Sequence, residues 1–350
     1  MFLNILKVRQ AMPVQRKSSF ELLRLLSIFG VVLLHISYDN SGDMNSADWA
    51  RLLFRWCVPF FFILSGYFLT SSDGYPDLKI SKIKNLSIII FFSNLLYLPF
   101  IVYIKHFSFL SGQLFYTGTW FHLWFLNSLL LSYFFVLVFA DAKFRFLYIS
   151  SCSIIIFCLF YFVDFMSSVN ARSYYSYLGV IRQFQSIPFV WLGFLLSKNH
   201  FFLINKTLRA AICFIMLGFF LCFLEVFLCI VYDLPLKNRT LLVGFPFVCI
   251  GLIIGGEVIS FKKGLDNLIL HASQYTLVVY IIHPLVIPLA SKFLALLSLQ
   301  EFYRLIVNAS FTFLISYFIA LLMKNYFPYC YNLLKGKFND SSTQCYKDSN

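Results

Sequence analysis

The sequence predicts an all-α fold: a polytopic integral membrane helical bundle of about ten transmembrane helices with both termini in the cytoplasm. Composition is the first indication, since 60% of the 350 residues are hydrophobic, only 12% are charged, and the mean hydropathy is +0.79. A soluble domain carries about 25% charged residues, so that class is excluded. The nine cysteines show no paired spacing, which argues against a disulfide framework and a zinc site.

Ten apolar windows of about twenty residues follow one another along the chain, and each is long enough to cross a hydrocarbon core of ~30 Å as a helix. Short polar or charged segments separate them. Because no long soluble insertion and no internal repeat interrupts the series, the chain is predicted to form one membrane domain. The windows are 19–38, 52–70, 85–104, 119–139, 145–165, 178–197, 208–231, 240–260, 275–297 and 302–323.

Positive charge fixes the predicted orientation. With a cytoplasmic amino terminus, the inside segments hold eighteen Lys and Arg residues, whereas the outside loops hold only Arg51, Lys105, Arg172, Lys237 and Arg239. The positive-inside rule therefore favours cytoplasmic termini. It also accounts for the net charge of +13 without a nucleic-acid partner, because no basic domain with interleaved aromatic residues is present.

The first window contains an arginine and a histidine eleven residues apart, Arg24 and His35. On a helix they are separated by about 16 Å along the axis, so Arg24 is predicted near the cytoplasmic end and His35 near the outer end. Ionisable side chains inside a bilayer are costly, and they are functional candidates by default.

Other polar residues are predicted in the outer half of their windows: Arg55, His122, Arg182 and Glu225. A transport pathway would more often spread such groups along the full depth, whereas this distribution gathers acid, base and guanidinium groups at one level, as a reaction site would. Gln183 and Gln185 accompany Arg182 and are expected to line a wet cleft. Gly66 and Gly193 are expected to allow close helix approach.

The arginine, ten intervening residues and histidine of the first window resemble the integral membrane acyltransferase-3 family. The likeness continues, in family order, through VPFFFILSGYFL at 58–69, HLWFLNSLLLSYF at 122–134, IPFVWLGFLL at 187–196 and YTLVVYIIHPLV at 275–286. Many members carry an arginine-rich run after the second span, where this chain has KISKIK. Point charges of lysine there replace bidentate guanidinium groups.

This resemblance implies a membrane O-acyltransferase of the bacterial inner membrane. The expected reaction moves an acetyl group from cytoplasmic acetyl-CoA, a co-substrate rather than a bound cofactor, to a hydroxyl of a surface polysaccharide or its lipid-linked precursor (O-antigen, capsule or exopolysaccharide). The expected domain covers residues 1–335, followed by a polar, disordered cytoplasmic tail at 336–350. No metal is expected.

The residue types suit this chemistry. A sugar hydroxyl is a poor nucleophile, and His35 is the predicted general base because histidine titrates near neutrality. The oxyanion needs fixed donors, for which Arg55, Arg182, Trp124 and Asn127 are candidates. The remaining predictions concern substrate and donor binding. Acceptor binding is assigned to these four residues together with His122, Glu225 and His283. Arg24 is predicted to be catalytic together with His35, and donor binding is assigned to Arg24, Lys79, Lys82 and Lys84.

Several alternatives stay open. His122 is equally explained as an interfacial ring, and His283 as a partner for carbonyls freed by Pro284. Glu225 is equally explained as a protonated or arginine-paired structural acid, and Arg24 as a residue reaching the headgroups. The competing function is a glycan exporter or flippase without acyl transfer, and a third is a structural partner in a polysaccharide assembly complex. Gly- or Pro-broken helices repeated in matching halves, which are typical of transporters, are not expected. The sugar, the acyl group and the oligomeric state stay open.

Overall fold

The computed structural model is a helical bundle, and it describes residues 17–36, 44–69, 80–105, 117–139, 145–169, 179–197, 206–236, 239–297 and 300–337. Within these ranges no strand occurs. The helices, including the short 3₁₀ segment η2, are α1 (Ser18–His35), α2 (Ser46–Phe54), α3 (Cys57–Tyr67), α4 (Ile80–Lys105), α6 (Trp124–Phe139), α7 (Arg145–Val169), η2 (Arg182–Gln185), α9 (Ser186–Ser197), α10 (Leu208–Val231), α11 (Phe245–Val258), α12 (Lys263–Ser273), α13 (Thr276–Ala295), α14 (Glu301–Tyr326) and α15 (Pro328–Leu334).

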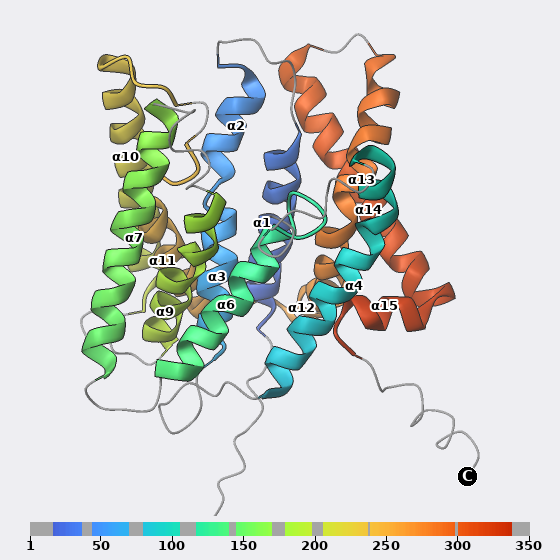
Figure 1. The fold of residues 1–350 in the computed structure, drawn as a ribbon, viewed down its shortest axis with the longest axis horizontal. Helices are drawn as coiled ribbons and strands as arrows, with labels where there is room; N and C mark the ends of the chain where they lie inside the picture. Colours follow the sequence, from blue (N-terminus) through green and yellow to red (C-terminus); the bar gives the residue numbers. More distant parts are fainter. Residues whose placement is uncertain are drawn as a thin grey trace, which may run out of the picture.

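The predicted fold class is confirmed. In the described part of the chain, 8 helical segments are long and apolar enough to cross a membrane. Two shorter apolar helices, at 124–138 and 245–258, coincide with the two remaining windows. The start of α1 and the end of α14 lie on one face of the bundle, the lower face of Figure 1. We refer to it as the inner face. Its assignment to the cytoplasm rests on the distribution of basic residues and stays a prediction, and the proposed tail lies mostly outside the described residues.

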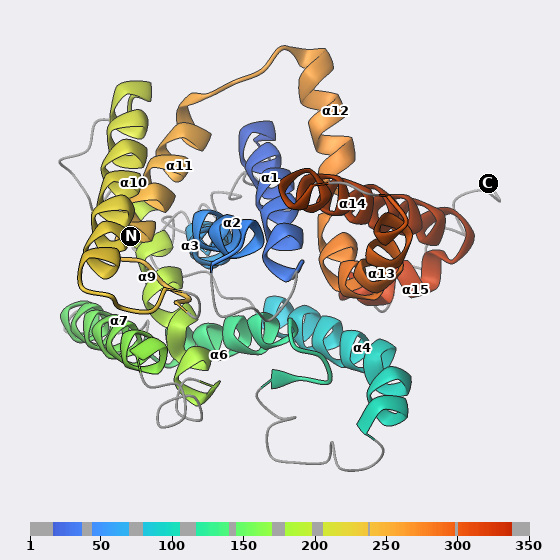
Figure 2. The same ribbon diagram turned by 90° about the horizontal axis from the view of Figure 1, so that it is seen from above.

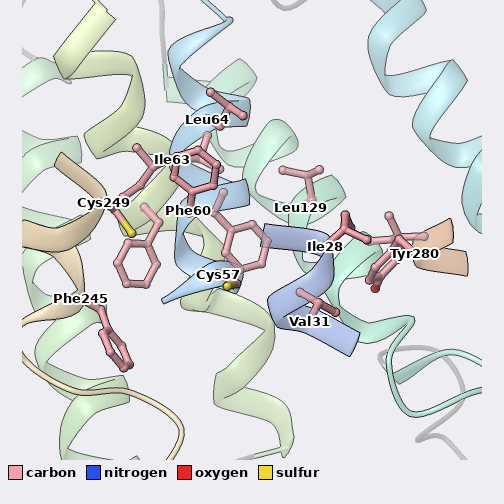
Figure 3. Close-up of a cluster of buried hydrophobic side chains, with 14 of the residues drawn as sticks. Ile28, Val31, Cys57, Phe60, Ile63, Leu64, Leu129, Phe245, Cys249 and Tyr280 are labelled. Atoms are coloured by element: carbon pink, nitrogen blue, oxygen red, sulfur yellow. The ribbon is translucent and has the colours of Figure 1, made fainter. Parts of the chain in front are cut away.

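Seen from above, α1, α2 and α3 occupy the middle of the bundle and the other spans surround them (Figure 2). The α3 side chains Phe60 and Ile63 pack in a buried apolar core between α1, α6 and α11 (Figure 3). α1 ends below the level that α2, α10 and α14 reach at the outer face (Figure 1). The residue at its upper end, His35, therefore lies inside the bundle rather than at its outer rim.

The close packing of α3 against α9 depends on two glycines, as expected. A Cβ on Gly66 would lie 1.9 Å from the carbonyl oxygen of Val190, and one on Gly193 would lie 1.9 Å from that of Ile63. No atom fits at these distances, so the backbones touch only because both residues lack a side chain.

Two spans are interrupted near the same level, and each interruption has a proline behind it. α2 and α3 form one span, broken at Arg55 and Trp56, and Pro59 lacks the N–H that would bond to the Arg55 carbonyl. In the span that contains α9, Pro188 has the same relation to Phe184, which lies within the 3₁₀ segment η2. Irregular backbone at membrane depth is tolerated where it is buried in protein or lines a cavity.

Candidate active site

Three imidazole rings from three separate parts of the chain meet inside the bundle. The ring centroids of His35 and His283 lie 5.3 Å apart, those of His122 and His283 5.5 Å, and those of His35 and His122 6.4 Å. His122 and His283 are 1% and 0% exposed, whereas His35 is only partly buried. We call these three residues the histidine centre. His35 is its accessible member, which agrees with its predicted role as the reacting base.

His35 is the last residue of α1, so the centre lies at the end of this helix where the sequence predicted it. α1 ends below the level that α2, α10 and α14 reach (Figure 1), and His283 is the eighth residue of α13, about 10 Å along that helix from its inner end. The centre is therefore surrounded by neighbouring helices.

His283 is held by its own helix. Pro284 has no N–H for the carbonyl of Tyr280, four residues earlier. The Nδ1 atom of His283 takes that place, 2.7 Å from the Tyr280 oxygen and 3.3 Å from the Val279 oxygen. His283 is therefore a partner for the carbonyl that Pro284 frees, which was one of the two explanations that the sequence left open. The same ring also lies beside the His35 ring.

His122 precedes α6 in a turn that neighbouring tyrosines hold. The Tyr280 hydroxyl donates to the His122 carbonyl at 2.5 Å, and the Tyr97 hydroxyl donates to the Ile281 carbonyl at 2.6 Å. The His122 ring lies 5.2 Å from each of these two tyrosine rings, measured between centroids. A fully buried ring in this setting is not an interfacial anchor, so the structure favours the site over that alternative.

Two arginines, Arg51 and Arg182, lie within electrostatic range of His35. Arg51 donates from Nε to the Leu34 carbonyl at 3.2 Å and from Nη2 to the Ile36 carbonyl at 3.3 Å, which caps the end of α1 on either side of His35. Its Nη1 binds Asp48 at 3.1 Å. The buried Nη1 of Arg55 has no hydrogen-bond partner among the described residues. Arg51 was not predicted as a site residue, because sequence reasoning counted it only as a loop charge.

Arg182 stacks on an aromatic ring at the start of α6. Its Cζ lies 4.0 Å from the centroid of the buried Trp124 ring. The 3₁₀ segment that carries Arg182 is tied to α6 by two serines: Ser128 donates to the Gln183 carbonyl at 2.7 Å, and Ser186 donates to the Ser128 carbonyl at 2.5 Å. These hydroxyls satisfy carbonyls at the break, as expected inside a membrane.

Two further residues beside this segment were expected to contact substrate. Gln183 is buried, and neither atom of its amide has a hydrogen-bond partner within the described part of the chain. Asn127 lies one turn after Trp124 on α6 and is partly buried. A buried amide without a partner is uncommon, and it fits a position that a polar ligand or water completes.

The predicted donor-binding residues lie towards the inner face. Arg24 binds Glu21 at 2.8 Å, and its guanidinium lies 5.5 Å above the Phe68 ring. Lys82 donates to the Phe68 carbonyl at 3.3 Å, so Arg24 and Lys82 both contact this residue. Lys84 is exposed on α4. Lys79 lies outside the described residues.

Arg24 and His35 share one face of α1, because eleven residues make slightly more than three full turns. The buried side chains of Ile28 and Val31 lie between them on that face. Figure 3 shows both near Leu129 and Tyr280. α1 therefore presents a charged inner end, an apolar middle and a titratable outer end along a single line.

Glu225 belongs to a different group. It forms an ion pair with Arg239, accepts from the Tyr161 hydroxyl at 2.8 Å and accepts from the Val243 N–H at 2.7 Å. Asp164 lies 3.7 Å from the Arg239 Nε and accepts from the backbone of Thr240 and Leu241, and from the Thr240 hydroxyl. We call Asp164, Glu225 and Arg239 the carboxylate clamp. Its contacts support the structural alternative for Glu225, with Arg239 as the partner that sequence reasoning had placed in a loop.

No group of three or more His, Cys, Asp or Glu residues suited to a metal ion is found in the described ranges. The polar groups at the centre are imidazoles, guanidinium groups and amides. These can accept a proton and stabilise a developing negative charge.

Comparison with known proteins identifies a family. A family model described as an acyltransferase domain, Acyl_transf_3, matches residues 17–323, which span α1 through most of α14. No curated protein and no solved structure matches the chain. The matched region contains the histidine centre, the Arg24 group and the carboxylate clamp. The chain belongs to the acyltransferase-3 family and is a multi-pass membrane acyltransferase.

Proposed function

We propose that the protein transfers an acetyl group from cytoplasmic acetyl-CoA to a hydroxyl of a surface polysaccharide, or of its lipid-linked precursor, at the inner membrane of a bacterium. The observation that carries this proposal is the histidine centre: a partly accessible imidazole, His35, lies among buried histidines and arginines inside a chain of the acyltransferase-3 family.

In the proposed reaction, His35 takes the proton of the sugar hydroxyl while its oxygen attacks the thioester carbonyl. A C–O bond forms, and the carbonyl oxygen becomes an oxyanion. When the tetrahedral intermediate collapses, the C–S bond breaks, and the proton on His35 passes to the departing sulfur. The products are the acetyl ester and free coenzyme A, so no oxidant or metal is needed.

Arg55 and Arg182 are the proposed electrostatic partners of the oxyanion. Arg182 lies within electrostatic range of His35, and Arg55 lies within range of Arg182 and Arg51. The Nη1 atom of Arg55 is buried and has no hydrogen-bond partner among the described residues. Preorganised donors in a dry site stabilise developing charge far more than donors in water, and loss of one such donor typically costs about 10²–10³-fold in rate. The stacking of Arg182 on Trp124 fixes its orientation before substrate binds.

The donor is proposed to approach from the inner face, where Arg24 and Lys82 lie around Phe68. Charge-assisted bonds to the phosphates of coenzyme A would anchor it there. Its acyl arm would then extend about 16 Å along α1, past Ile28 and Val31, to reach His35. The acceptor is proposed to enter from the outer face, above the recessed end of α1.

One observation supports the competing function of a glycan exporter. Broken helices at membrane depth are typical of transporters, and the breaks behind Pro59 and Pro188 show that this chain has them, although not as matching repeats. The family match favours acyl transfer.

Membrane vesicles containing the glycan and supplied with radiolabelled acetyl-CoA separate the two functions. Label should appear on the glycan with the wild type and with His271→Ala, which changes an exposed histidine on α12 outside the centre. Label should be lost with His35→Ala at normal abundance. Glycan export by a wild type that transfers no label would favour the exporter.

A further inference from the structure

We infer that His283 is a positioning residue that fixes the tautomer of His35. The Tyr280 carbonyl, which Pro284 leaves without an N–H partner, holds the proton of His283 on Nδ1 and so leaves a lone pair on Nε2. The inference rests on the proposed function for its kinetic consequence. Its structural part, the protonation state of a single ring, stands by itself.

The first step concerns Nδ1 of His283. This atom lies 2.7 Å from the Tyr280 carbonyl oxygen and 3.3 Å from the Val279 carbonyl oxygen. A carbonyl can only accept, so Nδ1 must carry the proton. In the neutral imidazole, Nε2 is then an acceptor without hydrogen.

The second step concerns what Nε2 faces. Nε2 is buried and has no hydrogen-bond partner among the described residues, in a ring that is 0% exposed. The His35 ring is its stacked neighbour, with centroids 5.3 Å apart and planes 26° apart. Two imidazoles joined by an N–H···N bond of about 3 Å have centroids about 5 Å apart. Because the lone pair of Nε2 lies in the plane of the His283 ring, the bond requires the His35 ring to move from the stacked arrangement towards that plane.

The remaining groups around the pair do not compete for this role. Arg51, Arg182 and Tyr97 approach from other elements and Tyr280 lies on α13 itself, and all four are donors in this setting. The other candidate acceptor is His122, whose buried ring nitrogens also have no hydrogen-bond partner among the described residues, but its ring lies farther from His35, at 6.4 Å between centroids against 5.3 Å for His283. Nε2 of His283 is therefore the acceptor best placed for an N–H of His35.

The third step is the consequence for catalysis. If one nitrogen of His35 donates to His283, its other nitrogen must hold a lone pair, which is the form a general base needs. When His35 accepts the substrate proton, the resulting imidazolium keeps its bond to the neutral His283. His283 thus has the orienting role that a carboxylate has in serine hydrolases.

The direct test is nitrogen NMR of the folded, full-length protein in lipid nanodiscs with ¹⁵N-labelled histidine. The chain has 6 histidines, and the His283 signals are identified by their loss in His283→Gln. We expect a protonated Nδ1 and an unprotonated Nε2 for His283 in the wild type. A protonated Nε2, or an even mixture of tautomers, would overturn the inference whether or not the protein transfers acyl groups.

A matched pair of variants tests the kinetic part. His283→Gln keeps an acceptor at the position of Nε2, whereas His283→Asn keeps a donor at the position of Nδ1 but does not reach His35. We expect turnover of the glutamine variant to exceed that of the asparagine variant by at least about 10-fold, with unchanged KM for acetyl-CoA, because general-base catalysis contributes about 10²–10⁴-fold. Equal turnover of the two variants would contradict the positioning role.

Proline variants test the origin of the lone pair. Pro284→Ala restores an N–H for the Tyr280 carbonyl, so the His283 tautomer should shift towards protonated Nε2 and turnover should fall. Pro288→Ala, one turn later in the same helix and exposed, should change neither. An unchanged spectrum of Pro284→Ala would refute the proposed origin. A wild type without acyl transfer would instead refute the proposed function, and the spectrum would still decide the tautomer.

Discussion

The histidine centre and the carboxylate clamp are both buried in the bundle, but they satisfy their polar groups differently. In the clamp, Asp164 and Glu225 share Arg239 and also accept from backbone N–H groups of Thr240, Leu241 and Val243. Among the described residues, Nε and Nη1 of Arg239 are buried without a hydrogen-bond partner, although both acids of the clamp are paired with its charge. At the centre, the atoms without a partner are both ring nitrogens of His122 and Nε2 of His283. The difference is therefore one of charge: the clamp pairs opposite charges that hold helices together, whereas the centre gathers imidazoles, which can accept a proton.

The comparison also separates two kinds of buried charge. Removing one member of the carboxylate clamp leaves an uncompensated buried charge and destabilises the protein. Removing a member of the histidine centre takes away a group that acts on the transition state and leaves the resting protein largely unaffected. Stability and turnover should therefore respond in opposite ways at the two locations.

The largest effect on stability is expected for Arg239→Ala. This change leaves two buried carboxylates without their cation, and loss of one partner of a buried ion pair costs about 3–5 kcal/mol. Thermal unfolding in detergent should show the loss, while turnover per folded molecule should stay near the wild-type value. Arg209→Ala, at the exposed inner end of α10, is the control. If Arg239→Ala kept the wild-type stability but lost turnover, Arg239 would belong to the active site and not to the clamp.

A smaller effect is expected for Arg182→Lys. Lysine keeps the charge but loses the planar guanidinium that stacks on Trp124 at 4.0 Å. A cation–π contact in a desolvated site is worth about 2 kcal/mol, so kcat/KM for the acceptor should fall about 10-fold or somewhat more. The unfolding temperature should not change. Arg209→Lys is the matched control. Equal kcat/KM in the two variants would show that Arg182 does not contribute to the reaction at the histidine centre.

The smallest effect is expected at the inner end of α1. Arg24→Lys keeps a cation beside Glu21 but loses the bidentate geometry, so KM for acetyl-CoA should rise by a few-fold, about 1 kcal/mol or less, with kcat unchanged. Arg24→Ala should raise it further. A titration with radiolabelled acetyl-CoA measures both. If neither variant alters this KM, Arg24 serves only to pair Glu21 and reach the inner surface.

Much of the fold follows from the sequence because membrane spans are long and uniformly apolar. All ten windows coincide with helices, and the close approach at Gly66 and Gly193 was expected from two glycines alone. The short amphipathic helix α12 and helix α15 were not predicted, since neither is an apolar span. The helix breaks were also missed, although Pro59 and Pro188 each stand four residues after the broken turn.

The site could be predicted only in part. Residue type and approximate depth selected His35, His122 and Arg182 from the sequence. They could not pair Glu225 with Arg239 or place Arg51 over the carbonyls that end α1, because these contacts join residues from different elements.

The most direct test of the contrast compares His35→Ala and Glu225→Gln in the same nanodisc preparation. Turnover per folded molecule and unfolding temperature are measured for each. We expect His35→Ala to lose about 10²–10⁴-fold in turnover with an unchanged unfolding temperature. Glu225→Gln should unfold at a lower temperature and keep its turnover. The opposite result, with turnover lost in Glu225→Gln and retained in His35→Ala, would contradict the assignment of the histidine centre as the active site.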